Sequence, residues 1–587
     1  RIAGLLESAE IHTLSGRVED GDVVFDNTTS HLARLFKNGQ AIIGVCATGI
    51  LVRAVAPVLD DKTSEPPVIS IDETGASVVP ILGGHRGANQ LASRIAAETG
   101  AYPAITTASD TALGLALDDL PSGYELANPQ HVKGFTRRLL AGEELRIDGN
   151  SPWLDTARLN TRESAALELV VSERAVSGGP DRLVVHPKVL AVGIGAERGA
   201  DPSDALALVR ELLDDAGLAH QAVALLASLD LKEDEPAIHS VSETYSWPAR
   251  FLDAQRLEQE TPRLISPSDT VYQAVGCHGV AEAAALAAVG AEGELVVAKH
   301  IGRRVTCAIA RAPQPLDPNK TGRARARLAI VGLGPGGPHW RSQEADQLIC
   351  QASDIVGYGL YLELAGPLRG DQTAHDFALG EETARVAHAL DLACEGRQVA
   401  LVSSGDAGIY GMAALAFEMI DSGPARWRRI AVTVSPGISA LQAASARVGA
   451  PLGHDFCAIS LSDLMTPTSA IERRISAAAQ ADFVIAFYNP ASQRRRKLLS
   501  RAMDIVSQHR SGQTPLMVAR ELGRANESVD VVRLDQFDTD AVDMLSLVLV
   551  GSSKTQSFQT ANGHTSVYTP RGYSFDQSAL KLPKAAR

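Results

Sequence analysis

The stretch Leu328-Ala-Ile-Val-Gly-Leu-Gly-Pro-Gly-Gly-Pro338 joins a run of apolar residues to a glycine-rich turn. The apolar run is typical of a buried strand, and open α/β sheets bind ligands at such strand-end turns. The glycines match the G-x-G-x-x-G pattern of dinucleotide sites. However, Pro335 and Pro338 lack the N–H groups that hold a pyrophosphate, and Asp354 precedes the next predicted strand instead of ending it. The stretch therefore predicts an α/β sheet with another kind of ligand site.

Three further bends of this type follow along the chain, each after a short apolar strand. They are Ser403-Ser-Gly-Asp-Ala-Gly-Ile-Tyr-Gly411, Ser435-Pro-Gly-Ile-Ser-Ala440 and Tyr488-Asn-Pro490. Asp406 can accept hydrogen bonds from a ribose or an amine, and Ser435 and Ser439 offer hydroxyl groups at a helix start. One such bend usually does no more than connect two elements, but four in this order predict a binding cleft.

Together these bends resemble the tetrapyrrole (class III) S-adenosylmethionine methyltransferases. Within them, the runs Ala450-Pro-Leu-Gly-His-Asp-Phe456 and Ser460-Leu-Ser-Asp-Leu464 are similar to the precorrin-3B C17-methyltransferases of cobalamin synthesis. The resemblance covers residues 327–575. It implies two α/β lobes with S-adenosylmethionine in the cleft between them, a tetrapyrrole substrate, and a homodimer formed through this half.

The resemblance also implies which residues contact the cofactor. By motif they are Pro335, Ser404, Gly405, Asp406, Ile409, Ser439, Ala440 and Asn489, with Arg520 added from a looser motif. One departure is Ala407, where these enzymes often carry a proline. Alanine loosens the turn but keeps a small side chain, so we expect at most a modest effect on cofactor affinity.

The chemistry of the resembled reaction asks mainly for positioning, because the sulfonium methyl group is already activated. The reaction also contracts the macrocycle and removes a proton from a C20 hydroxyl, for which His454 and Asp463 are candidate bases or simply loop residues. The substrate's carboxylates need basic partners. Gln493-Arg-Arg-Arg-Lys497 is the densest basic cluster, and its alternative interpretation is a solvated helix face.

The N-terminal half contains two similar turns, Gly44-Val-Cys-Ala-Thr-Gly-Ile-Leu-Val-Arg53 and Pro80-Ile-Leu-Gly-Gly-His-Arg-Gly-Ala-Asn-Gln-Leu91. Small residues beside a helix start predict an anion-friendly pocket, and a histidine there titrates near neutral pH. His85, Thr48 and Arg86 are therefore candidate catalytic residues, with His85 as a general base and Arg86 holding an oxyanion. The alternative for His85 is a role in capping or support.

These turns resemble the cobalt-precorrin-5A hydrolase family. Ile105-Thr-Thr-Ala-Ser-Asp110 extends the match, and Leu190-Ala-Val-Gly-Ile-Gly195 and Leu295-Val-Val-Ala-Lys299 are similar to the family's C-terminal domain, so residues 1–312 are covered. The resemblance implies that a δ-lactone is opened and acetaldehyde released. Two alternatives stay open: a non-catalytic tetrapyrrole-binding N-terminal half, and a nicotinamide-dependent oxidoreductase in the C-terminal half.

The alternation of short strands with Ala/Leu-rich helices predicts a multidomain α/β fold with largely parallel sheets. Clusters of turn residues and prolines mark the joints between domains. The predicted division is an α/β domain at 1–119, a middle or connecting region at 120–185, an α/β domain at 186–312, a linker at 313–326, a two-lobed methyltransferase at 327–575 and a tail at 576–587.

Composition narrows the class of protein. The 587 residues have a formal net charge of −14, which disfavours non-specific binding to nucleic acid. The six cysteines lack metal-site spacing, so no metal is expected, and no apolar run is long enough to span a membrane. We therefore expect a cytoplasmic enzyme, with a start at Arg1 that indicates truncation or processing. Whether the substrate carries cobalt stays open.

Overall fold

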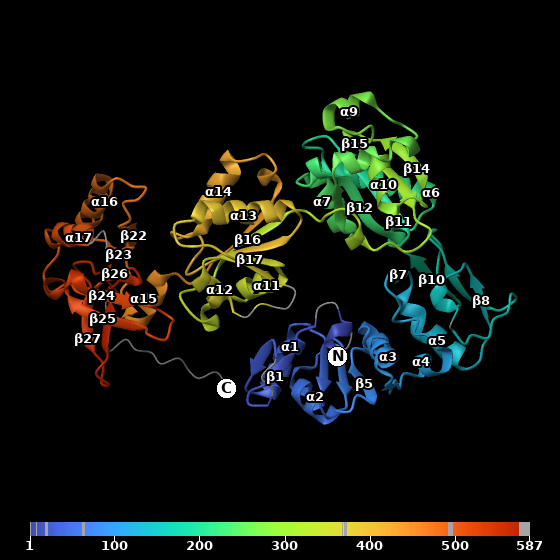
Figure 1. Ribbon diagram of the computed structural model, residues 1–587, viewed down its shortest axis with the longest axis horizontal. Coiled ribbons are helices and arrows are strands. Elements are labelled where there is room, and N and C mark those ends of the chain that lie inside the picture. The colour runs from blue at the N-terminus through green and yellow to red at the C-terminus, as the bar shows by residue number, and fades with distance from the viewer. Residues whose placement is uncertain are drawn as a thin grey trace. The chain divides into compact units, whose positions relative to one another are not determined.

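The computed structural model describes residues 2–6, 9–17, 21–60, 65–155, 157–366, 368, 372–490 and 497–573 (Figure 1). The chain divides into two compact units, which meet in sequence between Ala326 and Arg327. Both units contain sheets with parallel strand pairs and covering helices, which confirms the predicted α/β class. No helix in these described stretches is long and apolar enough to cross a membrane.

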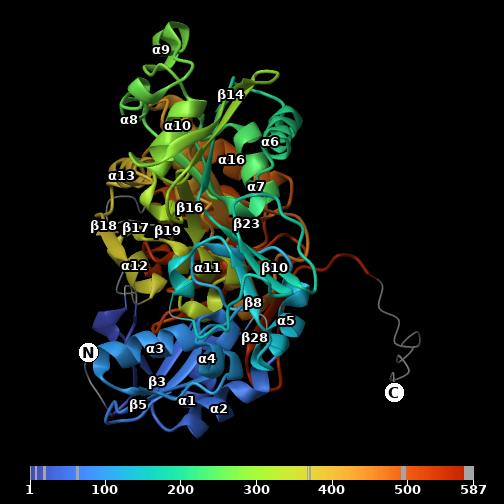
Figure 2. The same cartoon turned by 90° about the vertical axis from the view of Figure 1, so that its right-hand side faces the viewer.

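The first sheet of unit one has the order β3-β4-β5-β6. Apolar residues of α1 and α2 pack with β3 in one core cluster, and those of α3 pack with β4 and β5 in another, so both faces are covered. Figure 2 shows these helices around β3 and β5. The elements are β1 (His12–Leu14), β2 (Val23–Phe25), α1 (Thr28–Lys37), β3 (Ile42–Val45), α2 (Thr48–Val55), β4 (Val68–Ile71), β5 (Ser77–Leu82), α3 (Ala88–Thr99) and β6 (Tyr102–Pro103).

This sheet is less parallel than the sequence led us to expect. Strand β3 runs parallel to β4, but β4 and β5 form an antiparallel hairpin. The reversal is made by a tight turn in which the Asp72 carboxylate accepts hydrogen bonds from the backbone N–H groups of Thr74 and Ser77, at 2.9 and 2.6 Å. Gly75 supplies the positive φ of 71° that the turn needs. As a result, β3 and β5 end at opposite edges of the sheet.

The middle region, interpreted from its turn residues as a connection, forms a four-stranded sheet of order β7-β10-β9-β8. Its core contains Phe135, Leu145 and Leu167, each with no exposed surface. The turn residues therefore join strands inside a packed layer. The elements are α4 (Ala108–Leu113), β7 (Tyr124–Leu126), α5 (Val132–Leu140), β8 (Leu145–Asp148), β9 (Leu167–Val171) and β10 (Arg182–Pro187).

The last sheet of unit one has the order β13-β12-β11-β15-β14. A Cβ built on Gly193 of β11 would lie 1.9 Å from the Ala281 carbonyl oxygen, so glycine lets α10 pack directly on the strand. Phe251 and Arg323 exchange backbone hydrogen bonds, which attaches the 313–326 segment to edge strand β13. The elements are β11 (Leu190–Ala196), α6 (Pro202–Ala216), β12 (Val223–Leu229), α7 (Pro236–Tyr245), β13 (Ala249–Leu252), α8 (Ala254–Glu258), α9 (Asp269–Val275), α10 (Ala281–Val289), β14 (Glu294–Ile301) and β15 (Val305–Arg311).

Unit two begins with a lobe whose sheet has the order β18-β17-β19-β16-β20 (Figure 1). Strands β16 to β19 run parallel, so their carboxyl ends lie at one edge. The elements are β16 (Arg327–Gly332), α11 (Gln343–Gln351), β17 (Asp354–Gly357), α12 (Gly359–Ala365), β18 (Thr373–Asp376), α13 (Glu382–Cys394), β19 (Gln398–Ser403), α14 (Met412–Ser422) and β20 (Ala431–Ser435).

The second lobe has a mixed sheet of order β22-β23-β26-β24-β25 and a small sheet of order β21-β28-β27. The two lobes expected for residues 327–575 are therefore present. The elements are α15 (Ala440–Val448), β21 (Gly449–Ala450), β22 (Phe456–Ser460), α16 (Thr468–Gln480), β23 (Val484–Tyr488), α17 (Lys497–Ser507), β24 (Pro515–Arg520), β25 (Ser528–Arg533), β26 (Ser546–Val550), β27 (Gln556–Gln559) and β28 (Thr565–Tyr568).

Candidate functional site

Three glycine-rich bends meet at the carboxyl edge of the first-lobe sheet. The Gly334 N–H donates to the Gly405 carbonyl oxygen at 3.1 Å, and the Gly405 N–H donates back to Gly334 at 2.7 Å. Both glycines have a positive φ, of 75° and 71°. A Cβ on Gly437 would lie 2.1 Å from the Gly405 oxygen, and one on Gly332 would lie 2.7 Å from the same oxygen. The glycines therefore allow backbone-to-backbone contact between the bends after β16, β19 and β20.

Asp406 ties two of these bends together. Its Oδ1 accepts hydrogen bonds from the N–H groups of Gly408 and Ile409 at 2.8 and 3.1 Å, and its Oδ2 accepts from the Gly437 N–H at 3.1 Å. The carboxylate thus satisfies backbone donors of the tight turn, among which the Ile409 N–H also reaches the Asp406 carbonyl oxygen at 3.4 Å. Asp406, predicted to contact the cofactor, also holds the shape of the cleft.

The serines of the bends differ in what they do. Ser439 is the N-cap of α15: its hydroxyl accepts from the Gln442 N–H, and the Gln442 side chain accepts from the Ser439 N–H. Ser404 Oγ donates to the Gly334 carbonyl at 3.4 Å, which is a weak bond. Ser403 Oγ is buried and has no partner in the described part of the chain. Ser403, which sequence reasoning missed, therefore has a hydroxyl available for a ligand.

The first lobe contributes Tyr410 to the boundary between the lobes, and the second lobe contributes Tyr488 and a strained asparagine. Tyr410 and Asn489 have positive φ values of 54° and 50°, which non-glycine residues adopt at a cost. The Tyr410 hydroxyl donates to the Ala458 carbonyl at 3.1 Å, which links the lobes, and its ring lies 5.1 Å from that of Tyr488. Burial raises the pKa of both phenols, so both stay protonated at neutral pH.

The other residues predicted to bind the cofactor are less clearly grouped. Pro335 is buried, Ala440 is half-buried and Ile409 is 40% exposed. The Arg520 guanidinium donates to the Ala541 carbonyl and lies 3.4 Å from the Asp543 carboxylate. These contacts occupy a side chain that the looser motif had suggested for the cofactor.

The structure does not distinguish a catalytic base from a loop residue at His454 or Asp463, the two positions suggested for the ring-contraction chemistry. The Asp455 N–H donates to His454 Nδ1 at 2.8 Å. The Asp455 carboxylate also lies 3.4 Å from this nitrogen, so both contacts of Nδ1 come from the next residue of the loop. Asp463 lies in the loop after β22. The arginines of the basic cluster, Arg494 to Arg496, lie outside the described residues.

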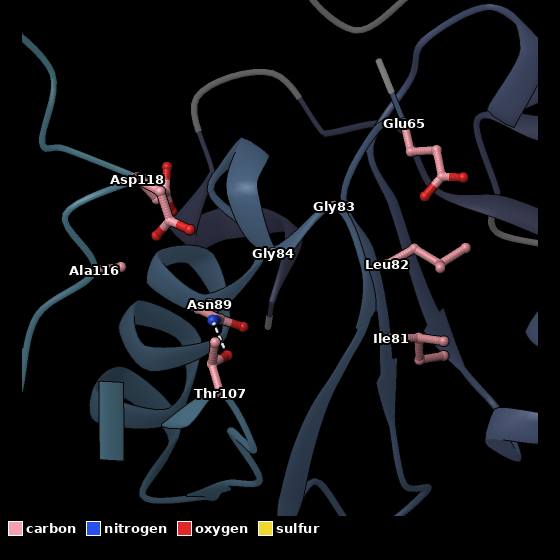
Figure 3. Close-up of a pocket in the computed structure, with 10 residues that line it drawn as sticks. Glu65, Ile81, Leu82, Gly83, Gly84, Asn89, Thr107, Ala116 and Asp118 are labelled. Atoms are coloured by element: carbon pink, nitrogen blue, oxygen red, sulfur yellow. Dashed lines mark hydrogen bonds between the residues drawn. The ribbon is translucent and has the colours of Figure 1, made fainter. Parts of the chain in front are cut away.

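In unit one, a cavity of 230 Å³ lies beside the turn that follows β5 (Figure 3). Gly83 has a positive φ of 73°, and a Cβ there would lie 2.7 Å from the Pro66 carbonyl. Figure 3 shows Glu65 and Asp118 on opposite sides of the space next to Gly83 and Gly84. The lining residues are Glu65, Ile81, Leu82, Gly83, Gly84, Asn89, Thr107, Ala116, Asp118 and Asp119.

The structure bears on two expectations about this half of the chain. The glycine-rich turn was expected to make an anion-friendly pocket, but three lining residues are acidic, and they come from segments that the local motif does not include. Thr48 begins α2, after β3, whereas the turn with His85 and Arg86 follows β5 at the opposite edge. The topology therefore separates Thr48 from the other two candidates. The side chain of His85 lies outside the described part.

Unit two is thus a two-lobed α/β unit whose glycine-rich bends meet at the carboxyl edge of a sheet, where proteins of this class bind ligands. The model for tetrapyrrole (corrin/porphyrin) methylases matches residues 327–538. A probable cobalt-factor III C(17)-methyltransferase of Salmonella typhimurium is 43% identical over 246 residues, which are 42% of this chain and 99% of that protein. The chain therefore belongs to the tetrapyrrole methylase family.

The N-terminal half matches two further family models. Models for the N-terminal and C-terminal parts of cobalamin synthesis G match residues 30–110 and 190–310, which confirms the fusion predicted from the sequence. Another relative, the precorrin-3B C(17)-methyltransferase of Sinorhizobium, is 40% identical over 42% of this chain and 96% of its own. The crystal structure of the methyltransferase CobJ is 37% identical, covers 42% of this chain and all of its own, and has a TM-score of 0.40.

Proposed function

We propose that residues 327–575 transfer a methyl group from S-adenosylmethionine to C17 of precorrin-3B or its cobalt-loaded counterpart, with contraction of the macrocycle. The observation that carries this proposal is the meeting of the bends at Gly334, Gly405 and Gly437 in a chain of this family. Similarity to relatives named for C17 methylation supports the choice of reaction. Family membership also favours this cofactor over a nicotinamide.

The residues of the cleft fit S-adenosylmethionine. A Cβ built on Gly405 would lie 4.0 Å from both Ser439 and Ala440, so the glycine leaves a gap between two bends. The buried Ser403 hydroxyl next to it has no partner in the described residues and can donate or accept. When bound, the cofactor supplies an activated sulfonium methyl group.

The chain's own contribution is to hold and enclose the reactants. Asp406 keeps the bend rigid through three backbone N–H groups, and the Tyr410 hydroxyl bonds to the second lobe. Fixing both lobes around one cleft converts a collision into a preorganised displacement, which is the main requirement for a pre-activated methyl donor. Protonated phenols at Tyr410 and Tyr488 cannot themselves act as bases at neutral pH.

For the N-terminal half we propose opening of the precorrin-5A lactone at the cavity beside Gly83. A volume of 230 Å³ lies below the roughly 300–1,000 Å³ of ordinary ligand pockets, so the cavity suits a ring substituent better than a whole macrocycle. Carboxylates such as Asp118 and Glu65, together with His85, are suitable residues for activating water. The rival is a tetrapyrrole carrier without catalytic activity.

One assay tests the methyl-transfer proposal. The purified chain is incubated with methyl-labelled S-adenosylmethionine and either precorrin-3B or its cobalt-loaded form. We expect label at C17 of one of the two products. Label on neither product, with a separately purified C17-methyltransferase active in the same assay, would overturn the proposal.

A second assay separates hydrolase from carrier. The chain is given the precorrin-5A lactone in ¹⁸O-water. Enzymatic opening releases acetaldehyde and leaves ¹⁸O in the new carboxylate, whereas a carrier binds the lactone and returns it unchanged. The homodimer expected through the methyltransferase half is tested by sedimentation equilibrium, where a monomer mass at micromolar concentration would contradict it.

A further inference from the structure

Arg385 on α13 is a deeply buried arginine with few partners. The residue is 2% exposed. One Nη donates to the Ala378 carbonyl at 3.0 Å and the other reaches the Met412 sulfur at 3.6 Å, while Nε has no partner in the described part. Of the five N–H donors of a guanidinium, one thus meets a good acceptor and one a weak acceptor. Among described residues, no acidic side chain forms an ion pair with it.

A second buried arginine has acceptors for most of its hydrogen-bond donors. Arg510 in the other lobe donates to the carbonyl groups of Ala479, His509, Phe483 and Gly551, at 2.7 to 3.3 Å. It also lies 3.1 Å from the Asp482 carboxylate. The hydrogen bonds and the nearby carboxylate therefore compensate the loss of water around the Arg510 charge, as is normal for buried charges. Arg385 has fewer such partners.

The position of Arg385 places it at the edge used for ligands. Ala378 follows β18 and Met412 ends the bend after β19, so the guanidinium lies at the carboxyl ends of parallel strands. Tyr358 and Tyr361 follow β17 at the same edge, with ring centroids 5.4 Å apart. Met412 directly follows the bend that contains Gly405, so Arg385 reaches the element beside one of the glycine bends.

The second lobe brings another arginine to the same edge of this sheet. Arg524 follows Gly523, whose backbone lies against Gly336: a Cβ on Gly336 would be 2.0 Å from the Gly523 oxygen. Arg524 Nε is buried without a partner in the described residues. Burial raises the pKa of Tyr361. The positive charges of Arg385 and Arg524 oppose this rise, and the negative charge of Glu382 adds to it, so both guanidinium groups act on this phenol. Glu382 forms no ion pair with either arginine in the described chain.

We propose that Arg385, Arg524 and the Tyr361 hydroxyl form a receptor for a carboxylate at the carboxyl edge of the first-lobe sheet. Two guanidinium groups and a phenol supply more donors than the described contacts use, and an arginine fork matches the two oxygens of a carboxylate. The negative charge of the bound carboxylate balances the positive charges of the two guanidinium groups. Because the lobes each supply one arginine, the bound carboxylate also bridges them.

Two molecules of the proposed reaction carry the required group, and this inference rests on that proposed function. The tetrapyrrole has acetate and propionate side chains, and S-adenosylmethionine has an α-carboxylate. The receptor chemistry is the same for both, so the source is decided by experiment. The probes are uroporphyrin, which is a carboxylated tetrapyrrole, S-adenosylhomocysteine, and decarboxylated S-adenosylhomocysteine.

The test measures equilibrium binding to the full chain and its variants R385Q, R385K, R524Q and Y361F. R428Q is the matched control, because Arg428 is an arginine of the same lobe with 61% of its side chain exposed. Circular dichroism and the melting temperature establish that each variant is folded. If R385Q does not fold, R524Q and Y361F decide, since Arg524 and Tyr361 are only partly buried.

If the tetrapyrrole supplies the carboxylate, R385Q and R524Q weaken uroporphyrin binding about 10- to 100-fold, with R385K in between and S-adenosylhomocysteine unaffected. If the cofactor supplies it, the same variants weaken S-adenosylhomocysteine but leave its decarboxylated analogue unchanged. Folded variants that bind all three probes like the wild type would overturn the receptor. A wild type that binds the probes but methylates nothing would overturn the proposed function and leave the receptor standing.

Discussion

The turns at Gly83 and Gly405 both follow a strand, and both use glycine in the left-handed region to begin a sharp change of direction. Their surroundings differ. Around Gly405, other backbone bends approach so closely that Gly332 and Gly437 tolerate no Cβ. Around Gly83 the close neighbour is Pro66, and Gly84 beside it would accept a Cβ with Asn89 no nearer than 3.9 Å.

The difference shows that the segments packed around a glycine-rich turn decide what kind of site it forms. In unit two, the turn is one part of a surface made by several bends at a single sheet edge. In unit one, the hairpin β4–β5 sends the two candidate turns to opposite edges, and the remaining space is lined by acids from distant segments. Four variants test this contrast.

The largest effect is expected for His85→Ala. Loss of a general base lowers the rate about 10²- to 10⁴-fold, here measured as acetaldehyde release from the precorrin-5A lactone. Thr48→Ala is the matched comparison, because Thr48 begins α2 at the other edge of the sheet. Equal losses in both variants would contradict the separation of the two turns. Normal release in His85→Ala would remove the histidine from the mechanism.

Gly437→Ala should disrupt the cleft. Its Cβ meets a backbone oxygen at 2.1 Å, so overpacking should cost about 1–3 kcal/mol or more of folding free energy and weaken S-adenosylhomocysteine correspondingly. Calorimetric titration and a melting curve measure both. Gly84→Ala has open space and should change neither by more than about 0.5 kcal/mol. A harmless Gly437→Ala would show that the bends can separate.

Asp406→Ala should weaken S-adenosylhomocysteine by about 1–3 kcal/mol, since three backbone N–H groups lose their acceptor. Asp421→Ala provides the control, because that carboxylate is 91% exposed. Titration calorimetry at constant pH is the measurement. An unchanged dissociation constant would place Asp406 outside the binding surface, whatever its structural role.

The smallest effect is a pH dependence. Asp354 is fully buried; burial alone would raise its pKa, but hydrogen bonds from Arg397, Ser353 and His375 lower it overall. Its stabilisation is therefore complete above the ordinary aspartate pKa and is lost as pH falls through the lowered folded value. Asp354→Asn should cost about 1–3 kcal/mol at pH 7 and progressively less in acid. Melting curves of wild type and variant are measured at pH 7 and at pH 3. An equal difference in melting temperature at the two pH values would contradict this.

Much of unit two follows from local pattern. Each bend near Asp406, Ser439 and Asn489 sits directly after an apolar strand, and parallel strands bring such ends to one edge. The contacts that sequence reasoning missed, such as the free hydroxyl of Ser403 and the Tyr410 link to Ala458, depend on how loops face each other. No short-range signal encodes that.

Unit one shows the opposite balance. The hairpin that reverses β5 is set by the Asp72 turn, a polar cluster that looks like any loop in sequence. The acids of the cavity, Asp118 and Glu65, lie far from the glycine motif along the chain. Charge at a site made from distant segments cannot be inferred from the motif alone. The acids around the cavity and the separation of Thr48 from His85 are therefore not visible in the local motifs.

The backbone contacts among Gly332, Gly405 and Gly437 also limit how this gene can change. Every amino acid reachable from a glycine codon by one nucleotide substitution adds a Cβ. At Gly437 and Gly332 that atom meets the Gly405 oxygen, so no neighbouring codon that changes the residue offers a neutral step. Ile409, four residues after Gly405 in the same bend, already carries a side chain, which is 40% exposed. Sequence drift in this cleft is therefore channelled into the positions between its glycines.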